Sequence, residues 1–534
     1  MMTRASLSRR GFLSSAAAAA ASLAVPSAGR GQMSMKKIAP NQASDSFRAD
    51  VDLELIAKPG SAPILPGRET NVWRYSAKLL AGPANTLTPM ADSYLGPVMR
   101  FTKGQKIRIR LRNELPERHI THWHGLHVPA LMDGHPAYAV DPGETFVYEF
   151  EILNRAGMHI YHPHPHEATA TQVYRGLAGA ILVNDEEEPA LGLPSGEFEL
   201  PVVIQDRTLN DANQLIYGGG MHRNMFGFYG ERILVNGRAD ARFEVASRAY
   251  RLRVMNGSNA RVYKLAWDDG TPITVLGVDG GLLEAPETRL YVMLAPGERL
   301  DVWADFAGRA VGSKLTLRSA RFYGALPRMA QHMMGGMMMD SGLPPGSDYP
   351  IAVFNVARAA NDSPALPKSL AKIARWRVED AANVNNPAAI KISEAPMSML
   401  LNGQPYDDDI QPGERFPVGT LQIIDIFRDQ ASGGMGGMGM MGRGMGMMFS
   451  MRHPIHLHGQ QFQIVARAFQ GGDEAYASVR DGFVDSGLKD TVLVSPGERV
   501  RILKPFGDFK GRFMFHCHIL EHEDMGMMRQ FLVE

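Results

Sequence analysis

The chain lacks disulfide cysteines and a surplus of charge of either sign. Only one of its 534 residues is a cysteine, Cys517, which excludes an internal disulfide. Lys plus Arg and Asp plus Glu number 56 each, so the broad basic field that nucleic-acid binding requires is missing. At 45% hydrophobic residues the chain can still bury proper cores.

A long apolar run is also absent. The longest is an Ala-rich stretch ending at Val25, and its length of about 15 residues falls short of the roughly 20 that cross a bilayer. It follows Arg9 and Arg10 in "SRRGFL", which resembles a twin-arginine export signal with Ser14 in place of the usual Lys. We expect residues 1–31 to be a cleaved signal that directs the protein to the periplasm. A membrane anchor is the alternative.

Export makes the single cysteine unusual. A lone thiol in an oxidising compartment is open to damage unless something holds its sulfur. Cys517 lies between His516 and His518 in "HCHILEHEDMGM" (516–527). This setting predicts a metal-bound sulfur.

The body of the chain has the pattern of β-structure. "RIRLRN" (108–113) and "FVYEFEI" (146–152) alternate as half-buried strands do, and long stretches of 3.6-residue period are missing. The pattern predicts an all-β fold of sandwich or barrel type.

An internal repeat divides the chain. "DPGETFVYEF" starts at Asp141, "APGERLDVWADF" at Ala295 and "SPGERVRILKPF" at Ser495, with a weaker copy, "QPGERF", at Gln411. Each is a turn followed by an alternating strand, which favours related β-domains. We expect three domains, at residues 45–185, 197–357 and 370–534.

Ten of the seventeen histidines fall in four clusters, two in the first repeat and two in the third. The clusters are "HWHG" (His122, His124), "HPH" (His162, His164), "HPIHLHG" (His453, His456, His458) and "HCHILEH" (His516, His518, His522). The middle repeat has only His222 and His332. Together with His119, His127, His135, His159 and His166, these two are expected to be structural or surface residues, although His332 could touch copper transiently.

Strand geometry separates these ligands into two groups. Residues two apart on a strand share a face, so His516 and His518 point one way and Cys517 the other. By the same rule His453 points away from His456 and His458. His453, Cys517, His522 and a weak Met527 form the ligand list of a blue-copper centre, while the eight other histidines suit several more ions. Zinc is the rival metal, and satisfied core histidines are the non-metal alternative.

With these motifs in order, the chain resembles the three-domain multicopper oxidases, particularly the bacterial laccase-like cuprous oxidases. The resemblance spans nearly the whole mature chain. It implies three cupredoxin domains, each a Greek-key β-barrel, and four copper ions. The implied ligands are His453, Cys517, His522 and Met527 for type 1 copper, His122 and His456 for type 2, and His124, His162, His164, His458, His516 and His518 for the type 3 pair.

The resemblance also implies a mechanism. A reductant gives single electrons to the type 1 copper, and Cys517 with its flanking histidines passes them to the trinuclear cluster, where O2 becomes water. Asp133 and Glu523 match acidic positions that supply protons. The alternatives for these two are a solvated loop carboxylate and a group that orients a ligand.

Two methionine-rich segments stand out. "RMAQHMMGGMMMD" (328–340) is the first, and "GGMGGMGMMGRGMGMMFSM" (433–451) ends two residues before His453. Soft thioethers favour Cu(I), so the segments predict Cu(I) capture; a disordered loop or an adaptable apolar lid is the alternative. Met451 matches a substrate-copper position, with Met447 and Met448 nearby, but Phe449 stands where an acidic partner is expected.

The sequence thus favours a monomeric oxidase of Cu(I) that confers copper tolerance, with O2 as electron acceptor, without nucleic acid as partner and without a membrane span in the mature chain. A laccase oxidising phenols is the nearest alternative. A non-enzymatic cupredoxin-fold protein for copper storage or assembly is the more remote one, because such a protein is expected to lose ligands that are all present here.

Overall fold

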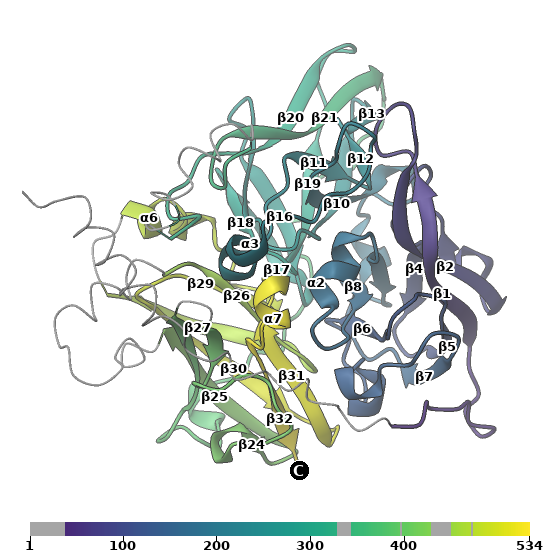
Figure 1. Cartoon of the computed structure of the whole chain (residues 1–534). Helices are drawn as coiled ribbons and strands as arrows, with labels where there is room; N and C mark the ends of the chain where they lie inside the picture. Colours follow the sequence, from purple (N-terminus) through teal and green to yellow (C-terminus); the bar gives the residue numbers. More distant parts are fainter. Residues whose placement is uncertain (1–37, 328–329, 331–342, 396–397, 429–449, 471–473) are drawn as a thin grey trace, which may run out of the picture. The chain divides into compact units, whose positions relative to one another are not determined.

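β-Strands build nearly all the regular structure, which confirms the predicted all-β class. The computed structural model describes residues 38–327, 330, 343–395, 398–428, 450–470 and 474–534. Residues 39–534 form one compact unit. Within it, three pairs of sheets follow one another along the sequence (Figure 1).

The first pair of sheets spans residues 51–184. One sheet has the order β2 (Thr70–Ala81), β1 (Val51–Ala62), β5 (Lys106–Asn113), β7 (Thr145–Glu151), and the other β3 (Leu87–Thr88), β4 (Val98–Thr102), β9 (Gly179–Asn184), β8 (Gly157–Pro163), β6 (Thr121–His124). Alternate residues of β1 and β5 are buried in one core with Trp123 of β6. The period-two pattern of the sequence therefore forms this core.

The second pair spans residues 199–358. One sheet has the order β12 (Arg238–Ala239), β11 (Arg232–Val235), β10 (Glu199–Arg207), β14 (Ala249–Asn256), β19 (Arg299–Asp305), β16 (Ile273–Val278), β17 (Gly281–Arg289), and the other β13 (Arg242–Ala246), β21 (Tyr349–Arg358), β20 (Lys314–Ser319), β15 (Tyr263–Trp267), β18 (Val292–Leu294). Their facing side chains form a separate hydrophobic core.

The third pair spans residues 388–533. One sheet has the order β23 (Ser398–Leu401), β22 (Ala388–Ala395), β25 (Thr420–Arg428), β30 (Glu498–Phe506), β27 (Phe462–Phe469), β28 (Leu488–Lys489), and the other β24 (Arg415–Phe416), β32 (Met528–Val533), β31 (Gly511–Cys517), β26 (His453–Leu457), β29 (Thr491–Val494). Cys517 and Met527 belong to the core between these sheets.

The strand pairing repeats three times. β1 pairs in parallel with β5, β10 with β14, and β22 with β25; each second strand then pairs antiparallel with β7, β19 or β30. The repeated "PGE" turn precedes β7, β19 and β30, and its glycine has φ near +80° (Gly143 86°, Gly297 82°, Gly497 79°), a conformation that favours glycine. The weaker copy at Gln411 instead forms a single turn before β24. The internal repeat thus has a structural basis, while the domain boundaries stay a prediction.

Helices are short in the described chain. The α-helices are α2 (Thr169–Tyr174), α3 (Gly220–Phe226), α6 (Glu474–Ala477) and α7 (Leu520–Asp524), and the 3-10 turns are η1 (Ala84–Thr86), η2 (Ala130–Met132), η3 (Pro136–Tyr138), η4 (Glu188–Leu191), η5 (Gly196–Phe198), η6 (Val378–Asp380), η7 (Pro412–Glu414) and η8 (Arg480–Gly482). α7 packs against α2 and α3, so helices of all three repeats meet (Figure 1). None of the described helices is long and apolar enough to cross a membrane.

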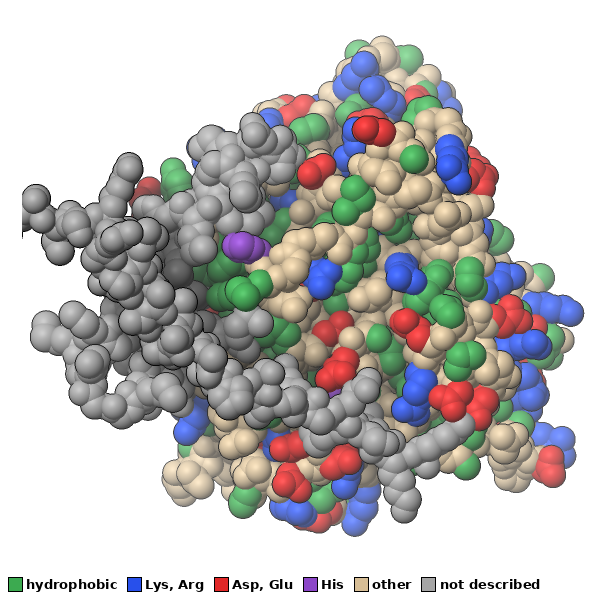
Figure 2. Space-filling model, in the orientation of Figure 1, with side chains coloured by type: hydrophobic (Ala, Val, Ile, Leu, Met, Phe, Trp, Pro, Cys, Tyr) green, Lys and Arg blue, Asp and Glu red, His purple; other side chains and the backbone are tan. Residues whose placement is uncertain are grey.

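Surface charge agrees with the balanced composition. On the face shown in Figure 2, acidic and basic side chains are interspersed over the described surface, and neither sign forms a continuous field.

Candidate metal centre

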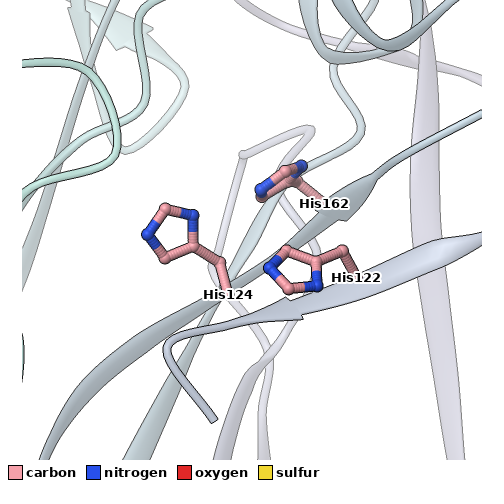
Figure 3. A group of neighbouring side chains, drawn as sticks. All are labelled: His122, His124 and His162. Carbon is pink, nitrogen blue, oxygen red and sulfur yellow. The ribbon is translucent and has the colours of Figure 1, made fainter. Parts of the chain in front are cut away.

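Strand pairing brings the two histidine clusters of the first repeat together. β6 runs antiparallel to β8, which sets His122 directly opposite His162. The rings of His122, His124 and His162 turn toward a common space (Figure 3), and one ring nitrogen from each lies within 4.8 Å of the others.

The third repeat is arranged in the same way. β26 runs antiparallel to β31, which pairs His456 with His516 and Ile455 with Cys517. His516 groups with His164 and His458, whereas Cys517 groups with His453 and His522. The prediction that neighbouring residues 516 and 517 serve different groups is confirmed.

Imidazoles from the two repeats form one cluster of eight. His122 stacks on His458 with ring centroids 3.8 Å apart, and His124 stacks on His456 at 3.7 Å. Nε2 of His516 lies 3.3 Å from Nε2 of His164 and 3.2 Å from Nε2 of His458. All eight rings are buried, with at most 5% of each residue exposed. We call this set the imidazole cluster: His122, His124, His162, His164, His456, His458, His516 and His518.

The sulfur group lies on the other side of β31. Cys517 Sγ is 3.4 Å from Nδ1 of His453 and 3.7 Å from Nδ1 of His522, and the N–H of Cys517 donates to the carbonyl of Met527 at 3.0 Å. Burial raises the pKa of Cys517 well above its ordinary value, so the sulfur is a thiol until a metal displaces the proton. We call His453, Cys517, His522 and Met527 the sulfur group.

The residues of both groups fit copper. Several buried ring nitrogens have no hydrogen-bond partner in the described structure, which is costly unless a metal satisfies them; they are Nε2 of His122, His162 and His456, Nδ1 of His124 and His164, and both nitrogens of His518. Burial, aided by neighbouring rings, lowers the pKa of His162, His164 and His518 well below the ordinary value, so their lone pairs are free at neutral pH. A thiolate with imidazoles suits copper, and eight imidazoles exceed what one tetrahedral zinc takes.

Comparison with known proteins agrees with this geometry. Residues 71–188 and 440–534, which contain all four histidine clusters, match multicopper oxidase family models. The chain is 30% identical to a laccase of Bacillus subtilis over 81% of this chain and 87% of that protein. The chain belongs to the multicopper oxidases.

The fold of this oxidase is also similar to those of solved multicopper oxidase structures. The McoA multicopper oxidase of Aquifex aeolicus matches with a TM-score of 0.72 and 30% identity, over 94% of this chain and all of that one. A multicopper oxidase of Campylobacter jejuni, described as a metallo-oxidase, matches with a TM-score of 0.70 and 26% identity, over 93% and 94% of the two chains. These relatives establish a copper-binding, cupredoxin-fold oxidase that uses O2 and a reductant.

The two acidic residues predicted to serve the oxidase touch the imidazole cluster. Asp133 Oδ2 accepts from Nδ1 of His458 at 2.7 Å, and its backbone carbonyl accepts from Nδ1 of His122 at 2.5 Å. Glu523 Oε2 lies 3.1 Å from Nδ1 of His516. Both residues are 2% exposed, so the solvated-loop alternative is wrong. Burial raises the pKa of Asp133, and the proton role stays a prediction.

Asp490 and Arg299 are partners of the cluster that the sequence did not reveal. Asp490 Oδ1 accepts from Nε2 of His124 at 3.0 Å, and its carbonyl accepts from Nδ1 of His456 at 2.9 Å. Arg299, from β19 of the middle repeat, donates to both carboxylate oxygens of Asp490 at 2.7 and 2.5 Å. Burial opposes ionisation of Asp490, but Arg299 outweighs it and holds the pKa well below the ordinary value.

Glu394 is a further partner, on the sulfur group. Its Oε1 lies 3.0 Å from Nε2 of His453 and accepts from the N–H of Met451 at 2.8 Å. An acidic neighbour is absent at Phe449, as the sequence shows, but β22 supplies a carboxylate from another part of the chain. Met451 is buried at 3% exposure. Met447, Met448 and both methionine-rich segments, apart from Ala330 and residues 450–451, lie outside the described residues.

Three of the remaining histidines have side-chain partners outside the two groups. His119 Nδ1 lies 2.7 Å from Gln172, His135 Nε2 3.1 Å from Gln530, and His127 Nε2 2.6 Å from Asp508. His222 is exposed on α3, and His332 lies outside the described residues.

Lys504 is a buried cation near Asp133 and Asp490, and it should make stability depend on pH. Its Nζ donates to the carbonyl of Gln460 at 2.5 Å, and burial lowers its pKa to about 7 despite the nearby carboxylates. Because an unfolded lysine keeps its proton up to about pH 10, the folded protein is penalised below pH 7 and gains stability as the pH rises from 7 to 10.

We therefore expect Lys504→Met to raise the free energy of unfolding at pH 6 by several kcal/mol, at about 1.4 kcal/mol per unit of pKa shift. The difference from the parent should shrink toward pH 10. Urea unfolding at pH 6, 8 and 10 measures it, with exposed Lys510→Met as the matched control. Parallel pH profiles for parent and Lys504→Met would contradict the buried-cation interpretation.

Proposed function

We propose that this oxidase uses Cu(I) as its reductant and serves copper tolerance. The proposal depends on one observation: the outer ring nitrogens of both histidines in the sulfur group are buried and already have hydrogen-bond partners. Nε2 of His453 faces Glu394 and Nε2 of His522 faces the carbonyl of Met225 at 3.1 Å, and neither histidine is more than 1% exposed. A phenol that docks against a histidine edge needs an open edge, whereas a metal ion needs only soft donors nearby.

The proposed ligand set follows the predicted assignment. The sulfur group holds type 1 copper, His122 and His456 hold type 2, and the remaining six members of the imidazole cluster hold the type 3 pair, four ions in all. Copper in these sites supplies one-electron oxidation of the reductant and reduction of O2 to water. Further support comes from the Campylobacter jejuni relative described as a metallo-oxidase.

The chain's own groups have definite tasks in this reaction. Glu394 and the carbonyl of Met225 fix the rings of His453 and His522 from behind, which leaves each Nδ1 directed at Cys517. Asp490 fixes His124 and His456 in the same way. Asp133 and Glu523 are placed to hold protons at Nδ1 of His458 and His516 for delivery to reduced oxygen.

The destination of the protein is part of the proposal. The twin-arginine-type signal at residues 1–31 lies outside the described residues. Its sequence supports export to the periplasm, where one thiol held by copper is protected from oxidation. We propose that the mature protein acts there as a monomer.

Deletion of residues 432–448, which lie outside the described residues, tests the choice of reductant. We expect oxygen consumption with Cu(I) to collapse and phenol oxidation to persist or rise, because the deletion removes thioethers while leaving the copper ligands in place. The control replaces residues 432–448 by a Gly/Ser segment that retains the methionines in their positions. Unchanged Cu(I) oxidation after deletion would refute capture by this segment, and a parent that oxidises phenols but not Cu(I) would make the protein a laccase.

A further inference from the structure

Helix α3 joins the middle repeat to the sulfur group. The carbonyl of Met225 accepts from Nε2 of His522, and α3 packs against α7, the helix that carries His522. Met225 and Phe226 also belong to the hydrophobic cluster that contains Cys517 and Met527. The repeat that was expected to lack copper ligands therefore reaches the sulfur group through α3.

One turn of α3 presents three donors suited to Cu(I). Met221 and His222 precede Met225 by four and three residues, the spacings at which helical side chains are neighbours. Met221 is 61% exposed, His222 is exposed and Met225 is 8% exposed. The first two residues of this turn therefore lie at the surface, and the last is buried next to the sulfur group.

Residues 220–226 carry no carboxylate side chain. Arg223 is the one Lys or Arg among them; its Nη1 donates to the carbonyl of Tyr217 at 2.9 Å, and its guanidinium lies 4.1 Å from the centre of the Tyr217 ring. Two thioethers and one imidazole suit Cu(I), whereas Mg²⁺ and Ca²⁺ prefer oxygen ligands.

We propose that Met221, His222 and Met225 form an entry site for Cu(I) on the middle repeat. The inference rests on the proposed use of Cu(I) as reductant. The bound ion gives up one electron and becomes Cu(II), and the electron crosses from Met225 through the N–H···O contact to His522. Four such electrons and four protons convert one O2 into two waters. Cu(II) is harder than Cu(I) and binds thioethers less well, so the product leaves.

Binding is tested first, without turnover. The copper-loaded protein is reduced with ascorbate under argon and titrated with Cu(I) against a chromophoric Cu(I) chelator. We expect the double variant Met221→Leu/His222→Ala to bind one Cu(I) at least about tenfold more weakly than the parent. Loss of a residue that only hydrogen-bonds to a metal ligand already lowers metal affinity by about that factor. Met90→Leu, a half-buried methionine of the first repeat, is the matched control.

Turnover then separates the entry site from the proposed function. KM for Cu(I) should rise about tenfold in the double variant, while turnover with a substitution-inert iron complex stays at the parent value. Parent-like binding and parent-like KM would overturn the entry site even if the parent oxidises Cu(I). An equal loss with both reductants would also overturn it, because α3 would then only support His522. Weakened binding in a protein whose parent never oxidises Cu(I) would instead refute the proposed function and leave α3 as a binding site.

Discussion

Arg299→Met is expected to lower the free energy of unfolding by about 3–5 kcal/mol, because it leaves the carboxylate of Asp490 buried without its cation. Arg299 is 1% exposed and Asp490 is fully buried. The guanidinium also donates to the carbonyls of Met158 and Gly297, which belong to different repeats. One substitution thus removes contacts that join the middle repeat to both of its neighbours.

Copper binding should change in the same variant. An unpaired Asp490 is expected to take up a proton, and the bond of its carboxylate to His124 then weakens, whereas its backbone carbonyl still accepts from His456. We expect urea unfolding to show the stability loss in copper-free protein and metal analysis to show weaker retention of copper in the imidazole cluster. The control is Arg377→Met, which breaks an exposed pair with Asp380 and should change the free energy of unfolding far less, because solvent screens such a pair. If both variants lose the same free energy of unfolding, the buried pair of Arg299 and Asp490 stabilises the protein no more than an exposed pair does.

The fold class and the grouping of ligands were predictable from sequence because both depend on local geometry. In residues 516–518, strand periodicity alone separates the sulfur of Cys517 from the two flanking imidazoles. The repeated "PGE" turn revealed three related units, since each copy precedes a strand with the same place in its sheet. The four histidine clusters were visible because their successive members are two to four residues apart.

The partners of those ligands were not predictable, because they come from distant parts of the chain. Asp490 is 366 residues from His124, and Glu394 is 59 residues from His453. Arg299 lies in the repeat that has no histidine cluster, so ligand spacing gave no reason to consider it. A weak signal existed at Lys489 and Asp490, a charged pair next to the β-branched and apolar residues of "LKDTVLV" (488–494). Buried charges of this kind need partners, but the sequence does not identify them.

Cys517→Ser is expected to abolish the intense blue absorption of the copper-loaded protein and to reduce oxidation of every reductant to background. Cu–thiolate bonding produces the blue-copper character, and a serine hydroxyl is a poor ligand for this metal. The fold should survive, because the N–H of Ile519 that donates to Sγ at 3.4 Å can donate to a serine oxygen instead. The imidazole cluster, on the opposite face of β31, should keep its copper.

Three measurements check this result together. Absorption spectroscopy follows the blue band, metal analysis should find one copper fewer per chain, and oxygen uptake is measured with Cu(I) and with a phenol. Met527→Leu is the matched control: it removes the proposed weak ligand near Cys517, so the blue colour and activity should persist while the potential of the type 1 copper rises. A Cys517→Ser protein that stays blue would place the sulfur outside the metal site. Loss of all copper from this variant would instead show that the two ligand groups are not independent, because β31 would then transmit the loss of one metal to the other.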